Sequence, residues 1–314
     1  MNKLRENEKE SLLRIAYWYY KLNMTQAEIA ERLGLTRQRV NQLIGMLVDL
    51  GVVKIEISGL QDEDLELESA FERAFSLDQA FIFKVEDSEN YLELFGEKAA
   101  QSLGGIFKKG QKIGVSWGET LAATVTRMPV MSLGDCTVVQ MVGGLNSNNK
   151  LTKSDEITRM LAEKLGCDYQ LLYAPAIVES REAKEILEQD SAFAPMFEHI
   201  RNCDVALLGV GELREGATLY RQGYLSREAL DRLVEAGCAG DLAMQPFDKD
   251  GAWKRLNNII GVEPEHLAKI PCVIMLACGK KKVEAVLGAL RTGCVNVMMI
   301  DRAIAREIAE ICAL

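Results

Sequence analysis

The sequence predicts an α/β protein with an N-terminal winged helix-turn-helix domain and a larger, doubly wound, mainly parallel α/β domain. Residues 25–44 show two short helical patterns joined at a glycine, and a strand-like run follows them. From residue 80 onward, short apolar runs alternate with amphipathic helical stretches. Such alternation is typical of strands that are buried on both faces of a parallel sheet.

The composition fits two globular domains, because the chain has 314 residues, of which 48% are hydrophobic and 26% charged. It has no apolar run near the roughly 20 residues of a membrane helix. Its charged start, MNKLRENEKE, lacks the apolar segment of a secretory signal. We therefore expect a cytoplasmic protein without a membrane partner. The eight cysteines lack C-x-x-C spacing and only His199 and His266 accompany them, so we expect reduced thiols, no metal site and no cofactor.

The net charge of −9 is unevenly distributed along the chain. Residues 1–58 hold nine basic and seven acidic side chains, a net charge of +2, which leaves −11 for the remainder. A mildly basic first segment on an acidic body confines attraction for phosphate groups to one end of the protein. The overall acidity therefore does not exclude binding to nucleic acid.

The segment TQAEIAERLGLTRQRVNQLI, residues 25–44, has the features of a helix-turn-helix. Thr25 and Glu28 form a predicted capping box, and Gly34 supplies the positive φ that ends the first helix. Thr36 caps a second helix that runs to about residue 50. The small Ala30 allows the two helices to approach closely, while Val40 and Leu43 face their shared core.

The second helix carries polar side chains suited to the major groove of DNA. Arginine recognises guanine or phosphate, and glutamine or asparagine pairs with adenine. No acid occurs between residues 32 and 48, so this face does not repel DNA. The following run VVKIEI, residues 52–57, is predicted to be the wing strand. The candidate DNA-binding residues are Thr36, Arg37, Gln38, Arg39, Asn41, Gln42 and, in the wing, Lys54.

A boundary between the domains is predicted near residue 58. The run QDEDLELE, residues 61–68, holds five acids in eight residues and is either a solvated linker or the start of a connecting helix. We prefer a helix over 63–77, because apolar residues recur along one edge of it. The predicted organisation is a DNA-binding domain at 1–58, a linker helix at 59–78 and an α/β domain at 79–314.

In the α/β domain, each apolar run precedes a predicted helix. The predicted strands are FIFKV, KIGVS, CTVVQMVGG, YQLLYAP, DVALLGVG, CVIMLACG and VNVMMID. The predicted helices cover roughly 89–107, 118–127, 154–165, 180–189, 226–236, 281–291 and 302–311.

The candidate small-molecule site starts in IGVSWGETLAATV, residues 113–125, where a strand leads through a glycine turn into a helix. Ligands of doubly wound sheets bind at such carboxyl ends of strands, and a helix N-terminus favours an anion such as phosphate. Ser116 and Thr120 supply hydroxyl groups, Trp117 either covers a sugar ring or packs in the core, and Gly118 forms the turn. Glu119 would repel a phosphate unless its carboxylate points away.

Three further loops are expected at the same edge of the sheet. The first, residues 141–149, contains Gly143 and Gly144, and the second, residues 239–248, contributes Asp241 as an acceptor for sugar hydroxyls. The third leads from Gly279 into a helix with lysines at 280–282 in its first turn. Lysines oppose the dipole at a helix start, so an anionic ligand explains them, although a solvated face is the alternative.

The chain resembles the SorC family of sugar-responsive transcriptional regulators over nearly its whole length. The resemblance rests on the order and spacing of YYKLNMTQAEIAERLGLTRQRVNQLI, GVSWGETL, VVQMVGG, CDVALLGVGE, GCAGDLAMQPFDKDG and CGKKKVEAVLGALRTGCVNVMMIDRAIAREI. It implies an effector domain related to sugar-phosphate isomerases, a phosphosugar effector, and a homodimer or homotetramer. It further implies a phosphate loop at residues 116–120, hydroxyl recognition by Asp241 and recognition of the anionic end by Lys282. Glu119 departs from the Thr, Ser or Arg common in the family, which leaves an unphosphorylated sugar or polyol open.

Two classes of function remain in competition at this point. A DNA-binding regulator would bind operator DNA and a small sugar or sugar-phosphate effector. A sugar-phosphate isomerase or deaminase would need a poised general base, for which Asp241 and Glu263 are candidates. An enzyme has little need of a DNA-reading domain, so we predict a regulator. A nicotinamide-dependent dehydrogenase is a weaker third alternative.

Overall fold

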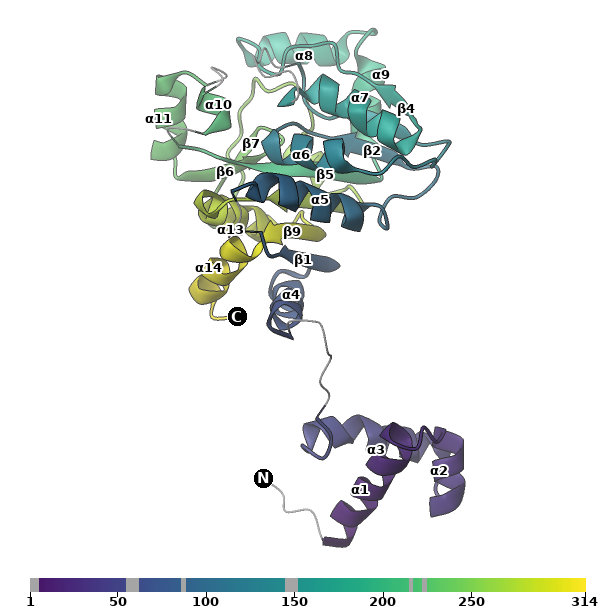
Figure 1. Cartoon of the computed structure of the whole chain (residues 1–314). Helices are drawn as coiled ribbons and strands as arrows, with labels where there is room; N and C mark the ends of the chain where they lie inside the picture. Colours follow the sequence, from purple (N-terminus) through teal and green to yellow (C-terminus); the bar gives the residue numbers. More distant parts are fainter. Residues whose placement is uncertain (1–5, 55–61, 86–88, 145–151, 215–216, 222–224) are drawn as a thin grey trace. The chain divides into compact units, whose positions relative to one another are not determined.

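The computed structural model describes residues 6–54, 62–85, 89–144, 152–214, 217–221 and 225–314, and it divides the chain into two compact units, Met1–Asp62 and Glu63–Leu314. The first unit contains α1 (Glu6–Tyr20), α2 (Gln26–Leu33) and α3 (Arg37–Asp49) (Figure 1). The predicted capping box is confirmed, because Thr25 Oγ1 accepts a hydrogen bond from the Glu28 N–H while the Glu28 carboxylate accepts one from the Thr25 N–H. Gly34 ends α2 with φ 64°.

The core of the first unit is small and made by all three helices. Ile15, Ile29, Val40 and Leu47 are each at most 1% exposed, and Ala30 lies where α2 meets α3. Val52 and Val53 pack against this core, but the described part of the predicted wing, residues 52–54, is not a strand. The rest of that predicted strand, residues 55–57, lies outside the described residues.

The second unit is built on a sheet whose main strands are all parallel and run in the order β1-β9-β8-β5-β2-β3-β4. The doubly wound fold class predicted from the sequence is confirmed. The chain first builds from β2 toward β4 and then returns beside β2 with β5, so the winding direction reverses between β2 and β5. The strands are β1 (Gln79–Phe83), β2 (Lys112–Val115), β3 (Thr137–Gln140), β4 (Asp168–Gln170), β5 (Val205–Glu212), β8 (Cys272–Ala277) and β9 (Val297–Asp301).

Alternate residues of the central strands enter two different cores. In β5, Val205 and Leu207 pack into one core while Ala206 and Leu208 pack into the other. One face of the sheet is covered by α5 (Tyr91–Leu103), α6 (Glu119–Arg127) and α7 (Ser154–Leu165). The other face carries α13 (Val283–Arg291) and α14 (Arg302–Cys312). Strands buried on both sides explain the continuous apolar runs of the sequence.

Helix α4 (Asp62–Phe75) covers the edge strand β1. Glu68 Oε1 accepts a hydrogen bond of 2.8 Å from the Ile82 N–H, and Glu72 Oε1 accepts one of 3.0 Å from the Ala80 N–H. Phe71, between them, is fully buried. The two carboxylates thus accept hydrogen bonds from backbone N–H groups of β1 that would otherwise be open to pairing with another strand. These contacts place α4 in the second unit.

The segment read as a loop at 239–248 is instead an antiparallel hairpin of β6 (Cys238–Leu242) and β7 (Gln245–Asp248). Its turn residues, Ala243 and Met244, have φ of 50° and 67°, the left-handed conformation of a tight hairpin turn. Strand β6 also pairs with the end of β5, with Gly211 opposite Asp241. The remaining helices are α8 (Arg181–Gln189), α9 (Ala194–Arg201), α10 (Thr218–Arg221), α11 (Arg227–Glu235), α12 (Pro264–Leu267) and the 3-10 turn η2 (Lys280–Lys282).

Candidate functional site

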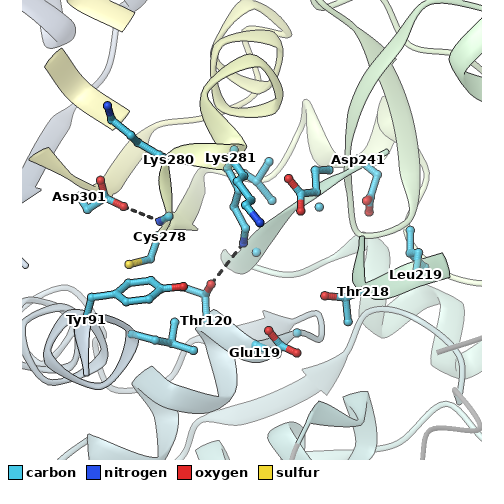
Figure 2. Close-up of a pocket in the computed structure, with 18 of the residues that line it drawn as sticks. Tyr91, Glu119, Thr120, Thr218, Leu219, Asp241, Cys278, Lys280, Lys281 and Asp301 are labelled. Atoms are coloured by element: carbon cyan, nitrogen blue, oxygen red, sulfur yellow. Dashed lines mark hydrogen bonds between the residues drawn. The ribbon is translucent and has the colours of Figure 1, made fainter. Parts of the chain in front are cut away.

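A cavity of about 620 Å³ opens at the carboxyl ends of β2, β5, β8 and β9 (Figure 2). It includes the point between β2 and β5 where the winding of the sheet reverses. Doubly wound sheets bind their ligands at this position, because the loops on either side diverge and leave a crevice. Its walls come from the start of α6, the β5–β6 pairing, η2 and α10.

The turn between β2 and α6 exposes the N-terminus of a helix to the cavity. Gly118 has φ 127° and ψ 165°, a backbone conformation that only glycine adopts without strain. Glu119 and Thr120 begin α6, and both line the cavity. Helix N-termini present N–H groups and a partial positive charge, which suits an anion at this place.

Lys282 lies across the cavity from this helix start. Its Nζ atom donates a hydrogen bond of 3.4 Å to Thr120 Oγ1, drawn as a dashed line in Figure 2. Burial lowers the pKa of the Lys282 ammonium, an effect that nearby acids, Glu212 first among them, oppose. The turn that carries Lys282 is fastened at its start, since the Gly279 N–H donates to Asp301 Oδ2 at 2.5 Å.

Asp241 supplies a buried acid to the same cavity. It is 3% exposed, and its Oδ2 accepts a hydrogen bond of 2.9 Å from the Met244 N–H in the hairpin turn. Its Oδ1 has no partner among the described residues. Burial raises the pKa of Asp241 to about 6, although the hydrogen bond from Met244 and the charge of Lys282 act in the other direction. A buried acceptor without a donor is costly, and a ligand hydroxyl would satisfy it.

Glu119 and Arg221 form an ion pair within the cavity wall. Arg221, at the end of α10, places a guanidinium nitrogen 3.2 Å from Glu119 Oε1 and 3.4 Å from Thr218 Oγ1. Both members of the pair line the cavity. The acid in the α6 turn is therefore opposed by a cation from a distant part of the chain.

The candidate DNA-binding side chains form an exposed surface on α3 in the first unit. Arg37 and Arg39 are exposed, and Thr36 is used as the helix cap, its Oγ1 accepting from the Arg39 N–H at 3.2 Å. Asn41 Oδ1 accepts from Gln26 Nε2 at 2.9 Å, which connects α3 to α2. The residues expected to read DNA, all exposed, are Thr36, Arg37, Gln38, Arg39, Asn41, Gln42 and Lys54.

Other kinds of site have no support in the described part of the chain. No group of three or more His, Cys, Asp or Glu side chains there is arranged to hold a metal ion. No described helix is both long and apolar enough to span a bilayer. The eight cysteines are free thiols.

Comparisons with known proteins agree with this arrangement. Residues 61–310 match the family model described as "Putative sugar-binding domain", and residues 23–54 match a winged helix-turn-helix DNA-binding model. The deoxyribonucleoside regulator of Bacillus subtilis (strain 168) is 29% identical over 312 residues, which cover 97% of this chain and 99% of that protein. The crystal structure of the full-length sorbitol operon regulator SorC from Klebsiella pneumoniae has a TM-score of 0.75 and 26% identity, covering 96% of this chain and 99% of that one.

The chain belongs to the SorC family. A DeoR family transcriptional regulator from Listeria monocytogenes is also similar to this chain, with a TM-score of 0.73 and 29% identity over 78% of this chain and 99% of that one. The prediction of a DNA-binding transcriptional regulator rather than an enzyme is confirmed by these relatives, which are regulators.

In this SorC-family chain, the structure brings together most of the cavity residues predicted from the sequence. Trp117, Gly118, Glu119, Thr120, Asp241 and Lys282 all line one cavity. Ser116 does not line it, because its side chain is buried beneath the turn and its Oγ accepts from the Gly209 N–H at 3.4 Å.

Gly143 and Gly144 require a correction, since they lie away from this cavity. The Gly143 N–H donates to Ile260 O at 3.0 Å, and the Gly144 N–H donates to Ala174 O at 2.7 Å. A side chain on Gly143 would collide with Pro175 O, since its Cβ would lie 2.6 Å away. Gly143 thus permits close backbone packing beyond β3, whereas a Cβ on Gly144 would make ordinary contact with Ala174 O at 3.6 Å. The rest of the predicted loop, residues 145–149, lies outside the described residues.

Sequence reasoning missed several residues that line the cavity, among them Arg221 and Gly211. Arg221 has no local signal, because its partner Glu119 lies 102 positions away. Gly211 faces Asp241 across the β5–β6 pairing, and a Cβ on it would lie 1.9 Å from Asp241 Oδ1. The run GVGE did contain this glycine, but the role depends on a strand pairing that was not predicted.

Proposed function

We propose that the cavity binds a small sugar or sugar phosphate and that its occupancy changes the affinity of the helix-turn-helix for operator DNA. The observation that carries this proposal is the buried, unpartnered Oδ1 of Asp241 in a cavity that also holds Lys282 and the start of α6. The cavity thus offers both an acceptor for hydroxyl groups and cationic donors, and the charges of Asp241 and Lys282 interact within it. A polyhydroxylated molecule with one anionic end has the complementary pattern.

The hydroxyl end of the ligand is assigned to Asp241. An ionised carboxylate accepts hydrogen bonds only, and its Oδ2 is already engaged by the Met244 N–H. Its Oδ1 is therefore the acceptor left for a ligand. Trp117, 9% exposed, supplies an apolar wall on which a sugar ring can pack.

The anionic end is assigned to the N-terminus of α6 together with Lys282. The N–H groups of Glu119 and Thr120 lie in the first turn of the helix, where intrahelical partners are lacking. The Thr120 hydroxyl and the Lys282 ammonium, 3.4 Å apart, provide two further donors. Charge-assisted hydrogen bonds of this kind favour a phosphate over a neutral group.

The exposed polar side chains of α3 support operator DNA as the partner of the first unit. Two such units in a homo-oligomer would contact half-sites about one helical turn apart, so a small rotation between them suffices to change affinity. Leu13, Tyr17 and Tyr20, spaced on one face of α1, are 50%, 57% and 40% exposed, which favours a homodimer or homotetramer over a monomer. We retain residues 1–58, 59–78 and 79–314 as the proposed DNA-binding, linker and effector regions, acting in the cytoplasm, where an operator lies.

The proposal is tested by ligand screening of the full-length chain followed by DNA binding. Thermal unfolding is measured with ribose 5-phosphate, glucose 6-phosphate, ribose, glucose, erythritol and sorbitol, because a ligand specific for the native state raises its stability. Duplexes are then selected from a random pool, and their affinity is measured with and without each stabilising compound. The proposal predicts at least one hit that changes DNA affinity. A hit that stabilises the Asp241→Asn variant equally would contradict the assigned site.

A further inference from the structure

Arg221 is the cavity residue whose role the assignments above leave open. It lies at the end of α10, the short helix that follows β5 in the chain, and its guanidinium is 3.2 Å from Glu119 Oε1. The side chains of both residues stay partly accessible, at 55% for Arg221 and 43% for Glu119. The pair is therefore open to the space that a ligand would occupy.

The position of Glu119 creates an electrostatic difficulty for an anionic ligand. Its carboxylate lies in the first turn of α6, one residue from Thr120, whose hydroxyl accepts from Lys282 Nζ. A negative charge at this place opposes a phosphate at the helix start, because like charges a few ångströms apart repel. A cation that neutralises Glu119 removes this opposition.

Most of the other charges around the cavity are already engaged. Glu212 is paired with Arg214 at 2.7 Å, and Asp301 accepts from the N–H groups of Gly279 and Ile304. Lys280 forms a long ion pair with Glu307, with 3.9 Å between Lys280 Nζ and Glu307 Oε2. Among the described residues, Arg221 is thus the cation that forms an ion pair with Glu119, while the buried Lys282 lies within Coulombic range of the same carboxylate.

We propose that Arg221 determines the specificity of the cavity for a phosphorylated ligand. Resting on the proposed function, this inference gives the guanidinium two tasks. One group of N–H donors holds Glu119 and cancels its charge, while the remaining donors face the cavity and contact the phosphate. A planar guanidinium has five donors and can serve two anions at once. An uncharged polyol has no negative charge, so neither the neutralisation of Glu119 nor the phosphate contact would raise its affinity.

The test is a double-mutant cycle on the full-length chain with inorganic phosphate as the probe. Affinity is measured by isothermal titration calorimetry at fixed ionic strength for the wild type, Arg221→Gln, Glu119→Gln and the double variant. Arg221→Gln is expected to weaken phosphate binding about tenfold, the size typical of a charge-assisted hydrogen bond. Glu119→Gln is expected to strengthen it severalfold. In the Glu119→Gln background, removal of Arg221 should cost less than in the wild type, because no acid is left uncovered.

Two matched variants complete the design. Arg181→Gln removes a guanidinium from an ion pair of 2.7 Å with Glu185 on α8, outside the cavity, and should leave phosphate affinity unchanged. Lys282→Gln tests the anion site itself and should weaken phosphate whatever Arg221 does. Should Arg221→Gln fail to fold, the Glu119→Gln result decides, because the inference requires higher phosphate affinity in that variant.

The outcomes separate this inference from the proposed function. Wild-type affinity in Arg221→Gln, together with weakened binding in Lys282→Gln, would overturn the role of Arg221 and leave the anion site in place. Equal losses on removing Arg221 with and without Glu119 would reduce Arg221 to an independent contact and overturn its coupling to Glu119. No phosphate binding by the wild type, with no phosphorylated compound raising its thermal stability, would overturn the anion site and the inference together.

Discussion

Arg302, buried at the start of α14, forms an ion pair with Asp64 in the first turn of α4. The residue before it, Asp301, accepts the Gly279 N–H in the cavity wall and caps α14 through the Ile304 N–H at 2.9 Å. Two consecutive residues thus contact the cavity turn and the helix that follows the DNA-binding unit in the sequence. The side chain of Arg302 is 6% exposed and that of Asp64 is 21% exposed, so water screens the pair little.

Asp64→Asn is expected to lower the free energy of unfolding of the second unit by about 3 kcal/mol, because it removes the carboxylate charge that faces a buried guanidinium. Urea unfolding followed by circular dichroism measures the change. Glu185→Gln is the matched control, since it removes the acid of an exposed ion pair on α8 and should have no measurable effect. Equal stability of the two variants would show that Asp64 contributes no more than a surface charge.

Two parts of the fold, β8 and the β6–β7 hairpin, show what the sequence could and could not predict. The parallel sheet was predictable, because the β8 residues Cys272–Ala277 are apolar at every position and such a run is typical of a strand with two buried faces. The β6–β7 hairpin was not, since Ala243 and Met244 adopt positive φ without the glycine or asparagine that usually marks such turns.

Within the site, residues that directly follow a strand were easier to predict than residues from other segments of the chain. Thr120 and Lys282 each follow a strand at the edge where ligands bind, so a general rule located them. Gly143 was misplaced by the same rule, because it follows β3, which lies beyond β2 and away from the winding reversal. Arg221 follows no strand directly, and its role depends on a contact across 102 positions.

Asp241 should make the stability of the ligand-free protein depend on pH. Its pKa in the folded state is raised by burial to about 6 from the ordinary value of 3.8, so the folded state binds more protons than the unfolded state between these values. The contribution of Asp241 to the free energy of unfolding is therefore fully present below pH 3.8, and this contribution is lost as the pH rises through about 6. The full effect is at most about 3 kcal/mol by linkage.

Asp241→Asn removes this contribution and is expected to raise the melting temperature at pH 7.5 while it abolishes sugar binding. Thermal unfolding of both proteins from pH 5 to pH 8, in the absence of ligand, measures the difference. The gap between the variant and the wild type should widen as the pH rises. A constant gap over this range would show that Asp241 does not titrate there.

Gly211→Ala is expected to abolish binding of the sugar that Asp241 recognises. The new methyl group would lie 1.9 Å from Asp241 Oδ1, so the carboxylate must move away from its present position. Calorimetric titration with a compound identified by thermal screening measures the loss. Gly144→Ala is the control, because its added Cβ would have ordinary contact at 3.6 Å and it lies outside the cavity. Normal binding by Gly211→Ala would mean that Asp241 is not the hydroxyl acceptor.

Replacement of Arg37 and Arg39 by alanine should weaken DNA binding without affecting the fold. Both side chains are exposed on α3, so the melting temperature is expected to stay within the error of the wild type. Fluorescence anisotropy with a duplex selected by the wild type measures affinity at several salt concentrations. An arginine that contacts phosphate contributes about one unit to the slope of log affinity against log salt, whereas one that reads a base changes sequence preference. Arg14→Ala on α1 is the control, and equal affinity of the control and the double variant would exclude α3 as the recognition helix.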